Sequence, residues 1–269
     1  MNTYHNLIIN HFTRAILVFF LILTFSSCSK GFPETPMVNS LRLNLKKGDT
    51  LRVAVYRGVA SCEECAETVK SAIEKLGVKY KLDFVGPEEL VDITEKNLSK
   101  YDIYVQPGGG QDINGAFRSL GQNRVQAIQN YVSNGGNYLG LCMGAYLADA
   151  NNLGLIKDEL DSEVGRPGFP VKNIDDTSVR LTWEGRNEYV FFQDGPFLLS
   201  AEGDQMFYKI ASYANGDLAA ARYSYGKGLV VLTGPHPEAN NTWFEKAEIP
   251  LDKRPSQDLF KDLIQSFYR

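Results

Sequence analysis

Between residues 51 and 150, short strand-like runs alternate with segments whose apolar residues recur at helical spacing. The strand-like runs cover residues 51–58, 79–86, 101–110 and 137–141. The helix-like segments cover residues 62–77, 124–136 and 143–150, while residues 87–100 are compatible with helix or loop. Parallel strands need long crossover connections, which are usually helices, so this alternation predicts a parallel α/β sheet.

The pattern changes after residue 165, where strand-like segments follow one another closely. These segments cover residues 178–185, 188–197, 205–214, 218–226 and 228–234, and a helix is predicted over 256–268. We expect antiparallel additions there, together with the last core strand. The predicted fold is therefore a flavodoxin-like α/β domain with a mostly parallel sheet, helices on both faces and antiparallel additions in the C-terminal half.

The N-terminal region carries an uninterrupted apolar run, AILVFFLILTF, of 11 residues. It is shorter than the roughly 20 residues of a membrane span, but it is typical of a signal peptide. It ends in FSSC, which resembles the lipobox of bacterial lipoproteins. We expect a signal peptide over 1–27, lipidation of Cys28, a tether over 28–48 and a domain over 49–269. The alternative is an ordinary signal peptide or an N-terminal anchor helix. The predicted location is the bacterial cell envelope, lipid-anchored and facing the periplasm or the exterior.

Charge and histidine content exclude two classes of function. Removal of residues 1–27 takes away Arg14, His5 and His11 and leaves 27 Lys and Arg against 32 Asp and Glu. A net charge of −5 gives no support to a nucleic-acid partner, which requires a basic surface. His236 is then the one remaining histidine, so a zinc site built from a histidine cluster is excluded. We expect neither a metal nor a cofactor.

One cysteine stands at an unusual position in GGNYLGLCMGAY, residues 135–146. Cys142 lies between Gly140 and Gly144, where a strand-like run passes into a helix-like segment. A nucleophile on such a sharp turn needs small neighbours, and the helix N-terminus favours thiolate over thiol. The pattern therefore predicts a nucleophile elbow with cysteine in place of serine. The alternative is a cysteine that is simply a small core residue.

A candidate base and its orienting group lie in LTGPHPE, residues 232–238. Pro237 favours an extended conformation at His236, and residues i and i+2 of an extended chain face the same side. Glu238 is therefore placed to hold the imidazole while the other ring nitrogen faces a thiol. The alternative is a histidine in a surface loop beside an unrelated acid.

A third candidate element is the loop QPGGGQD, residues 106–112, which follows a strand-like run. Consecutive glycines allow backbone N–H groups to converge on an anion, as an oxyanion hole requires. The alternative is a flexible loop. Three such elements at predicted strand ends favour a catalytic site.

These motifs resemble the class I glutamine amidotransferase superfamily, and more closely the N-terminal domain of eukaryotic-type biotin–protein ligases. The similarity extends from about residue 51 to residue 240, and the motifs occur in a specific order. The shared motifs are a first strand ending in Tyr56-Arg57-Gly58, the P-G-G loop, the G-x-C-x-G-x-Y elbow, Gly195-Pro196-Phe197 and the final G-P-H-P-E.

The resemblance implies a role for each matching residue. Cys142 would be the nucleophile, His236 the base and Glu238 the group that orients it. The oxyanion hole would be formed by backbone N–H groups near Gly109, Gly110 and Met143.

The sequence also departs from the superfamily. Glutamine-hydrolysing members carry glutamine four residues after the cysteine, where this chain has Tyr146. The PfpI-like branch has histidine directly after the cysteine, where this chain has Met143. We expect no biotinyl-transfer domain and no synthase to receive ammonia. A stand-alone hydrolase acting on a small-molecule or peptide substrate is therefore the better interpretation.

Cys62 and Cys65 form the motif SCEEC at a predicted helix start. Thioredoxin-like redox pairs occur at such positions, but the two glutamates between the cysteines disfavour a thiolate. A structural disulfide, which forms readily outside the cytosol, is the favoured interpretation.

The predicted function is therefore a lipid-anchored cysteine hydrolase that cleaves an amide or related acyl bond. Two alternatives stay open. One is a catalytically silent ligand-binding domain on the same fold, and the other is thiol–disulfide exchange at Cys62 and Cys65.

Overall fold

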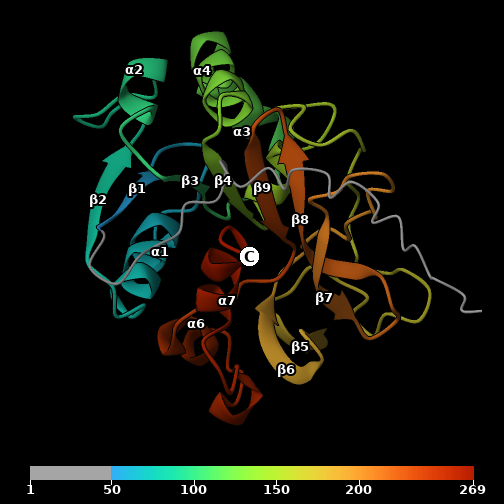
Figure 1. Ribbon diagram of the computed structural model, residues 1–269. Coiled ribbons are helices and arrows are strands. Elements are labelled where there is room, and N and C mark those ends of the chain that lie inside the picture. The colour runs from blue at the N-terminus through green and yellow to red at the C-terminus, as the bar shows by residue number, and fades with distance from the viewer. Residues whose placement is uncertain (1–49) are drawn as a thin grey trace, which may run out of the picture. The chain divides into compact units, whose positions relative to one another are not determined.

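The computed structural model describes residues 50–269 (Figure 1). The predictions made for the signal peptide over 1–27, for Cys28 and for the tether over 28–48 lie outside the described residues. None of the helices in the described part of the chain is long and apolar enough to cross a membrane.

The described strands form one nine-stranded sheet in the order β2-β1-β3-β4-β9-β8-β7-β5-β6. Their bounds are β1 Leu51–Tyr56, β2 Tyr80–Val85, β3 Ile103–Gln106, β4 Asn137–Leu141, β5 Thr177–Trp183, β6 Arg186–Phe192, β7 Tyr208–Tyr213, β8 Leu218–Tyr225 and β9 Gly228–Thr233. Five strands, β2, β1, β3, β4 and β9, run parallel, and the other four add antiparallel pairs at the β9 edge.

The parallel half of the sheet is covered on both faces, which explains its continuous apolar strands. Every residue of β3, β4 and β9 is buried. The carboxyl ends of these three strands lie at one edge of the sheet, because β3 pairs with β4 and β4 pairs with β9 in parallel register. Loops that follow parallel strands at this edge commonly bind ligands.

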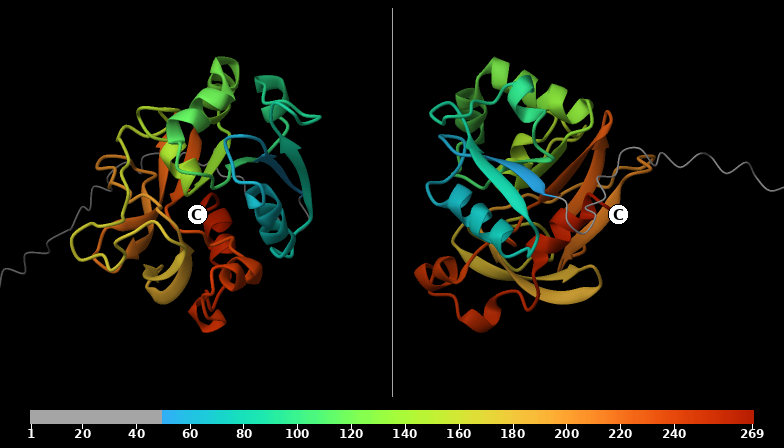
Figure 2. Two further views of the ribbon diagram at one scale, coloured as in Figure 1. Left: turned by 180° about the vertical axis from the view of Figure 1, so that it is seen from behind. Right: turned by 60° about the vertical axis from the view of Figure 1, so that its left-hand side comes forward.

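The antiparallel half extends the same sheet, and apolar side chains of β5 and β6 pack in one core with those of α7, Leu259–Ser266 (Figure 2). β5 and β6 form a hairpin whose turn residues, Glu184 and Gly185, both have positive φ. Such turns match the right-handed twist of the strands they join. β8 pairs with β9 along its length and so connects this half to the parallel core.

The helices lie on both faces of the sheet, as Figures 1 and 2 show. Their bounds are α1 Cys65–Glu74, α2 Glu95–Leu98, α3 Ile113–Leu120, α4 Gln122–Ser133, α5 Met143–Leu147, α6 Asn241–Lys246 and α7 Leu259–Ser266, with a 3₁₀ turn over Leu251–Lys253. Apolar side chains of α1 and α7 pack on one face, and those of α3, α4 and α5 pack on the other. Two apolar cores therefore sandwich the parallel strands.

The predicted fold class is confirmed, while several helix boundaries differ. The helix predicted over 62–77 begins only at Cys65 and ends at Glu74, and Gly77 has φ of 71° beyond its end. Most of 87–100 is loop. The helices α3 and α6 were not predicted, because α3 contains a glycine, which weakens its helical pattern, and α6 is only six residues long.

Candidate functional site

Cys142 stands between β4 and α5, where the backbone turns sharply. Its φ of 49° and ψ of −107° form a conformation that L-residues rarely adopt. The N–H of Cys142 donates to the carbonyl of Thr233 in β9 at 2.8 Å, and its own carbonyl accepts from Ala145 in α5 at 2.8 Å. The thiol is therefore fixed at the carboxyl edge of the sheet. Since α5 ends at Leu147, its dipole is weaker than a helix over 143–150 would provide.

The two glycines that flank this turn are required by close backbone packing. A Cβ at Gly140 would lie 2.4 Å from the carbonyl oxygen of Gly144. A Cβ at Gly144 would lie 2.1 Å from the carbonyl oxygen of Gln106 in β3. Both distances are far below van der Waals contact. The geometry is that of a nucleophile elbow, with the helix start pressed against two neighbouring strands.

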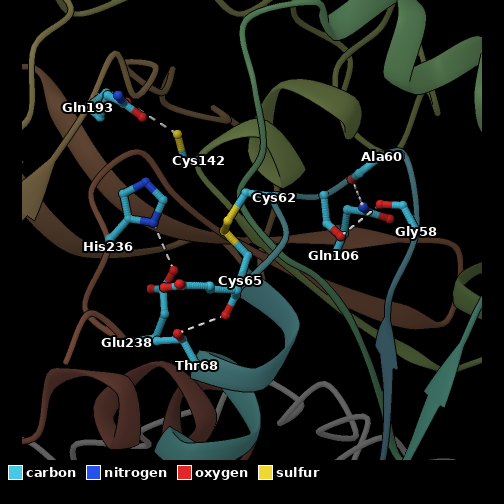
Figure 3. Close-up of a disulfide and its surroundings, with 12 residues drawn as sticks. Gly58, Ala60, Cys62, Cys65, Thr68, Gln106, Cys142, Gln193, His236 and Glu238 are labelled. Atoms are coloured by element: carbon cyan, nitrogen blue, oxygen red, sulfur yellow. Dashed lines mark hydrogen bonds and ion pairs between the residues drawn. A yellow bond between two sulfur atoms is a disulfide. The ribbon is translucent and has the colours of Figure 1, made fainter. Parts of the chain in front are cut away.

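His236 and Glu238 follow β9 and lie beside Cys142. The N–H of His236 donates to the carbonyl of Phe191 at 2.8 Å, which joins this loop to the end of β6. The imidazole Nδ1 and the Glu238 carboxylate oxygen Oε1 are 2.8 Å apart, and both side chains are buried. Because Nδ1–H donates to the carboxylate, Nε2 is left to face the thiol. Figure 3 shows the ring between Glu238 and Cys142.

The charges around His236 favour the imidazolium. Burial lowers its pKa, but the negative charges of Cys142 and Glu238 outweigh burial and raise the pKa from 6.5 to about 10. The raised pKa favours the protonated imidazole, with the Glu238 carboxylate on one side of the ring and the sulfur of Cys142 on the other.

Aromatic side chains enclose the imidazole. The ring centroid of His236 lies 5.2 Å from that of Trp243 and 6.0 Å from that of Phe191, both edge to face. Trp243 is held in α6, whose first turn is capped by the side chain of Asn240. This packing limits the rotation of the ring and restricts water around it.

The glycine loop after β3 lies against the same residues. A Cβ at Gly108 would be 2.6 Å from Cε1 of His236, and one at Gly109 would be 1.9 Å from Cε of Met143. The N–H groups of Gly109 and Gly110 find no backbone acceptor among the described residues. Met143 is the first residue of α5, so its N–H has no partner within the helix. All three residues line the same cavity as Cys142.

Cys62 and Cys65 are joined by a disulfide next to the glycine loop. The N–H of Cys62 donates to the carbonyl of Gly108 at 3.0 Å. The Sγ of Cys65 lies 3.6 Å from the position that a Cβ on Gly108 would take. The disulfide thus supports the loop at the glycine that contacts the imidazole. Figure 3 shows the disulfide together with His236 and Glu238.

A cavity of about 210 Å³ opens in front of Cys142. Four of its lining residues are among those predicted from the sequence: Cys142, Met143, Gly109 and Gly110. The remaining ones are Gln111, Ile113, Tyr146, Asp161, Ser162 and Asp194. A substrate group could therefore reach the thiol and the glycine loop from one space.

Two residues that contact the site after β6, Gln193 and Asp194, were missed by sequence reasoning. The thiol of Cys142 donates to the carbonyl of Gln193 at 3.4 Å. The hydroxyl of Tyr146 donates to the carbonyl of Asp194 at 3.1 Å. Both residues follow β6 and precede the Gly195-Pro196-Phe197 segment, which was the one signal in the sequence that could have located them.

The structure thus brings together Cys142, His236, Glu238 and the glycine loop, while Cys28 lies outside the described residues. Among residues 50–269, no group of three or more His, Cys, Asp or Glu side chains is arranged to hold a metal ion.

Comparison with known proteins supports this fold. Residues 51–165 match the family model described as biotin-protein ligase, N terminal. The chain is 28% identical over 214 residues to the biotin–protein ligase of Schizosaccharomyces pombe, covering 70% of this chain and 33% of the ligase. The chain therefore spans about a third of that relative's length.

Solved structures give the same result for the fold. PurLQS from Thermotoga maritima superposes with a TM-score of 0.54 at 16% identity, covering 81% of this chain and 97% of that one. A glutamine amidotransferase superposes with a TM-score of 0.50 at 15% identity, covering 73% and 99%. The resemblance predicted from the motifs is confirmed: the fold is glutamine amidotransferase-like, and residues 51–165 are similar to the N-terminal domain of biotin–protein ligases.

Proposed function

We propose that this protein is a cysteine hydrolase that cleaves an amide or related acyl bond through Cys142, His236 and Glu238. The main support is the 2.8 Å contact between Nδ1 of His236 and Glu238 beside a cysteine on a strained elbow. A glutamine amidotransferase-like fold is compatible with amide chemistry or with binding alone, so the proposal rests on these side chains. The similarity to a ligase covers 33% of that enzyme and does not extend the ligase's activity to this chain.

In the first half of the reaction, the Cys142 thiolate attacks the carbonyl carbon of the substrate. The carbonyl oxygen becomes an oxyanion, which the N–H groups of Gly109, Gly110 and Met143 stabilise. The imidazolium of His236 then donates its Nε2 proton to the leaving nitrogen or oxygen as the bond to carbon breaks. The products are a free amine or alcohol and a thioester on Cys142.

In the second half, the neutral imidazole accepts a proton from water, and the resulting hydroxide attacks the thioester carbonyl. The same N–H groups stabilise the second oxyanion. The bond to sulfur breaks, a carboxylic acid leaves, and the thiolate–imidazolium pair is restored. Glu238 accepts the hydrogen bond from Nδ1–H throughout, stays ionised and fixes the ring orientation.

The cavity argues against glutamine as the substrate. Tyr146 stands where glutamine-hydrolysing relatives carry glutamine, and its hydroxyl already donates to the carbonyl of Asp194. The side chain therefore forms part of the cavity wall and presents no amide to a substrate.

We also propose that the protein is exported and lipid-anchored at the bacterial cell envelope through Cys28. The apolar run, the FSSC sequence and the polar tether support this location.

Alkylation by iodoacetamide tests the proposed site without a known substrate. We expect rapid modification of Cys142 near neutral pH, slowed at least tenfold in His236→Ala because the imidazolium that pairs with the thiolate is lost. Glu238→Gln should slow it less, since this change affects ring orientation alone. Slow alkylation that is indifferent to His236 would favour a silent ligand-binding domain. Modification at Cys62 accompanied by exchange with an added disulfide would favour the redox alternative.

A further inference from the structure

The cavity in front of Cys142 is lined by acidic side chains and by no basic ones. Asp161 and Asp194 both border it, and none of its lining residues in the described chain is lysine or arginine. Because Cys142 lines this cavity, a substrate group that reacts with the thiol would lie in it. The two carboxylates determine the charge that such a group meets.

Two hydrogen bonds hold Asp194 in position, one to its main chain and one to its side chain. Its carbonyl accepts from the hydroxyl of Tyr146 at 3.1 Å, and its Oδ1 accepts from the hydroxyl of Ser162 at 2.5 Å. Its φ is 45°, in the left-handed region that few residues other than glycine adopt. Its Oδ2 has no hydrogen-bond partner in the described part of the chain. Asp194 therefore lines the cavity with one carboxylate oxygen bound by Ser162 and the other without a hydrogen-bond partner among the described residues.

Asp161 is fixed on the same wall through the next residue. Its Oδ1 accepts from the N–H of Ser162 at 2.8 Å, which is the residue that also binds Asp194. Asp161 is an exposed residue that lines the cavity. Ser162 therefore connects the two carboxylates and keeps both at one side of the space.

We propose that the acyl group cleaved at Cys142 carries a cationic amine, which Asp194 and Asp161 bind, and that acyl groups ending in a carboxylate are rejected. This inference rests on the proposed hydrolase function. A cation within several ångströms of half-buried Asp194 gains roughly tenfold in binding, and the gain at exposed Asp161 is smaller because water screens the charge. The volume of about 210 Å³ is sufficient for a short aminoalkyl chain or an amino-acid side chain.

Charged methanethiosulfonate reagents test the inference directly, because they differ in charge and share one reaction. The thiolate attacks the sulfenyl sulfur, a mixed disulfide forms and methanesulfinate leaves. The measured quantity is the ratio of the Cys142 rate constant for the trimethylammonium-ethyl reagent to that for the sulfonatoethyl reagent. Peptide mass spectrometry of the full-length protein assigns the modified cysteine, and the same peptide in urea-unfolded protein supplies the reference ratio.

We expect a cation-to-anion ratio at least tenfold above the unfolded reference. Asp194→Asn and Asp161→Asn should each reduce the ratio severalfold, and Asn at 194 can still accept from Ser162. Glu202→Gln removes an exposed charge from a residue that does not line the cavity, and it should leave the ratio unchanged. A wild-type ratio equal to the unfolded reference would overturn the inference, and so would a ratio unaffected by both aspartate variants. Rapid alkylation that depends on His236 would still support the hydrolase in that case, so the two failures are distinguishable.

Discussion

Gly108 and His236 are in such close contact that the imidazole occupies the space a side chain at position 108 would need. A Cβ there would lie 2.6 Å from Cε1 and 3.4 Å from Nδ1 of the ring. The glycine loop therefore sets the position of the candidate base as well as offering its own N–H groups.

Gly108→Ala should displace the imidazole and slow iodoacetamide alkylation of Cys142 by roughly tenfold or more, because small displacements of a catalytic group are costly. Gly110→Ala is the matched control, since no atom lies within 4 Å of the Cβ it would add. Equal rates in the two variants would show that the contact at Gly108 has no influence on the thiol.

The raised pKa of His236 depends on the negative charge of Cys142. Cys142→Ser should therefore lower this pKa strongly, because burial then acts against Glu238 alone. Nuclear magnetic resonance of the imidazole Cε1 proton across pH measures it, with the His236→Ala spectrum assigning the signal. Tyr146→Phe, which keeps the thiol, should leave the pKa raised.

The same shift predicts a pH dependence of stability. The pKa of His236 is 6.5 when unfolded and about 10 when folded, so the folded protein binds the proton more tightly. Its stabilising contribution is complete below pH 6.5 and is lost as the pH rises toward 10. Urea unfolding between these pH values should show a decline in the free energy of unfolding that is smaller in Cys142→Ser. A decline of the same size in both proteins would contradict the coupling.

Glu163 is a buried acid outside the candidate site. Its side chain has no exposed surface, and its Oε2 has no hydrogen bond within the described chain but lies 3.5 Å from Nε of Arg166. Burial raises its pKa from 4.5 to about 7. Since the folded state favours the protonated acid, its contribution to stability is complete below pH 4.5 and is lost as the pH rises through 7.

Glu163→Gln should therefore stabilise the protein at pH 8, on the order of 2 kcal/mol, and much less at pH 4.5. Glutamine retains the oxygen that accepts from Asn215. Glu159→Gln, an exposed acid nearby, should change the free energy of unfolding by less than about 0.5 kcal/mol at either pH. Destabilisation of Glu163→Gln at pH 8 would show that the ion pair with Arg166 outweighs burial.

Lipidation of Cys28 is tested by metabolic labelling with a fatty-acid probe. We expect the full-length protein to carry the label and Cys28→Ala to lose it, because the thiol is the attachment point. Persistence of the label in that variant would contradict the proposed anchor.

The sequence was sufficient to predict those parts of the structure that local residue patterns determine. The alternation of strands and helices predicted the parallel core, and the glycines beside Cys142 predicted its sharp turn. Cys142 and His236 follow β4 and β9, which turn out to be neighbours in the sheet. Residues at the carboxyl ends of neighbouring parallel strands meet at one edge, so their proximity could be inferred.

The cavity wall could not be inferred in this way. Ser162 and Asp194 are 32 positions apart and lie in loops that have no hydrophobic periodicity. Their contact depends on how the antiparallel half folds back toward β4 and β9. That arrangement follows from pairing between distant strands, which no short segment of sequence specifies.

The strained backbone at Cys142 has a consequence for how such a chain could evolve. A residue other than glycine at φ of 49° and ψ of −107° costs the fold on the order of 1–3 kcal/mol. Replacement by glycine would relieve that cost in a single step and leave the cavity and its carboxylates in place. A lineage selected for binding alone would gain stability by this change and would have no reason to keep the thiol. The cysteine therefore stands at this turn against the conformational preference of its own backbone.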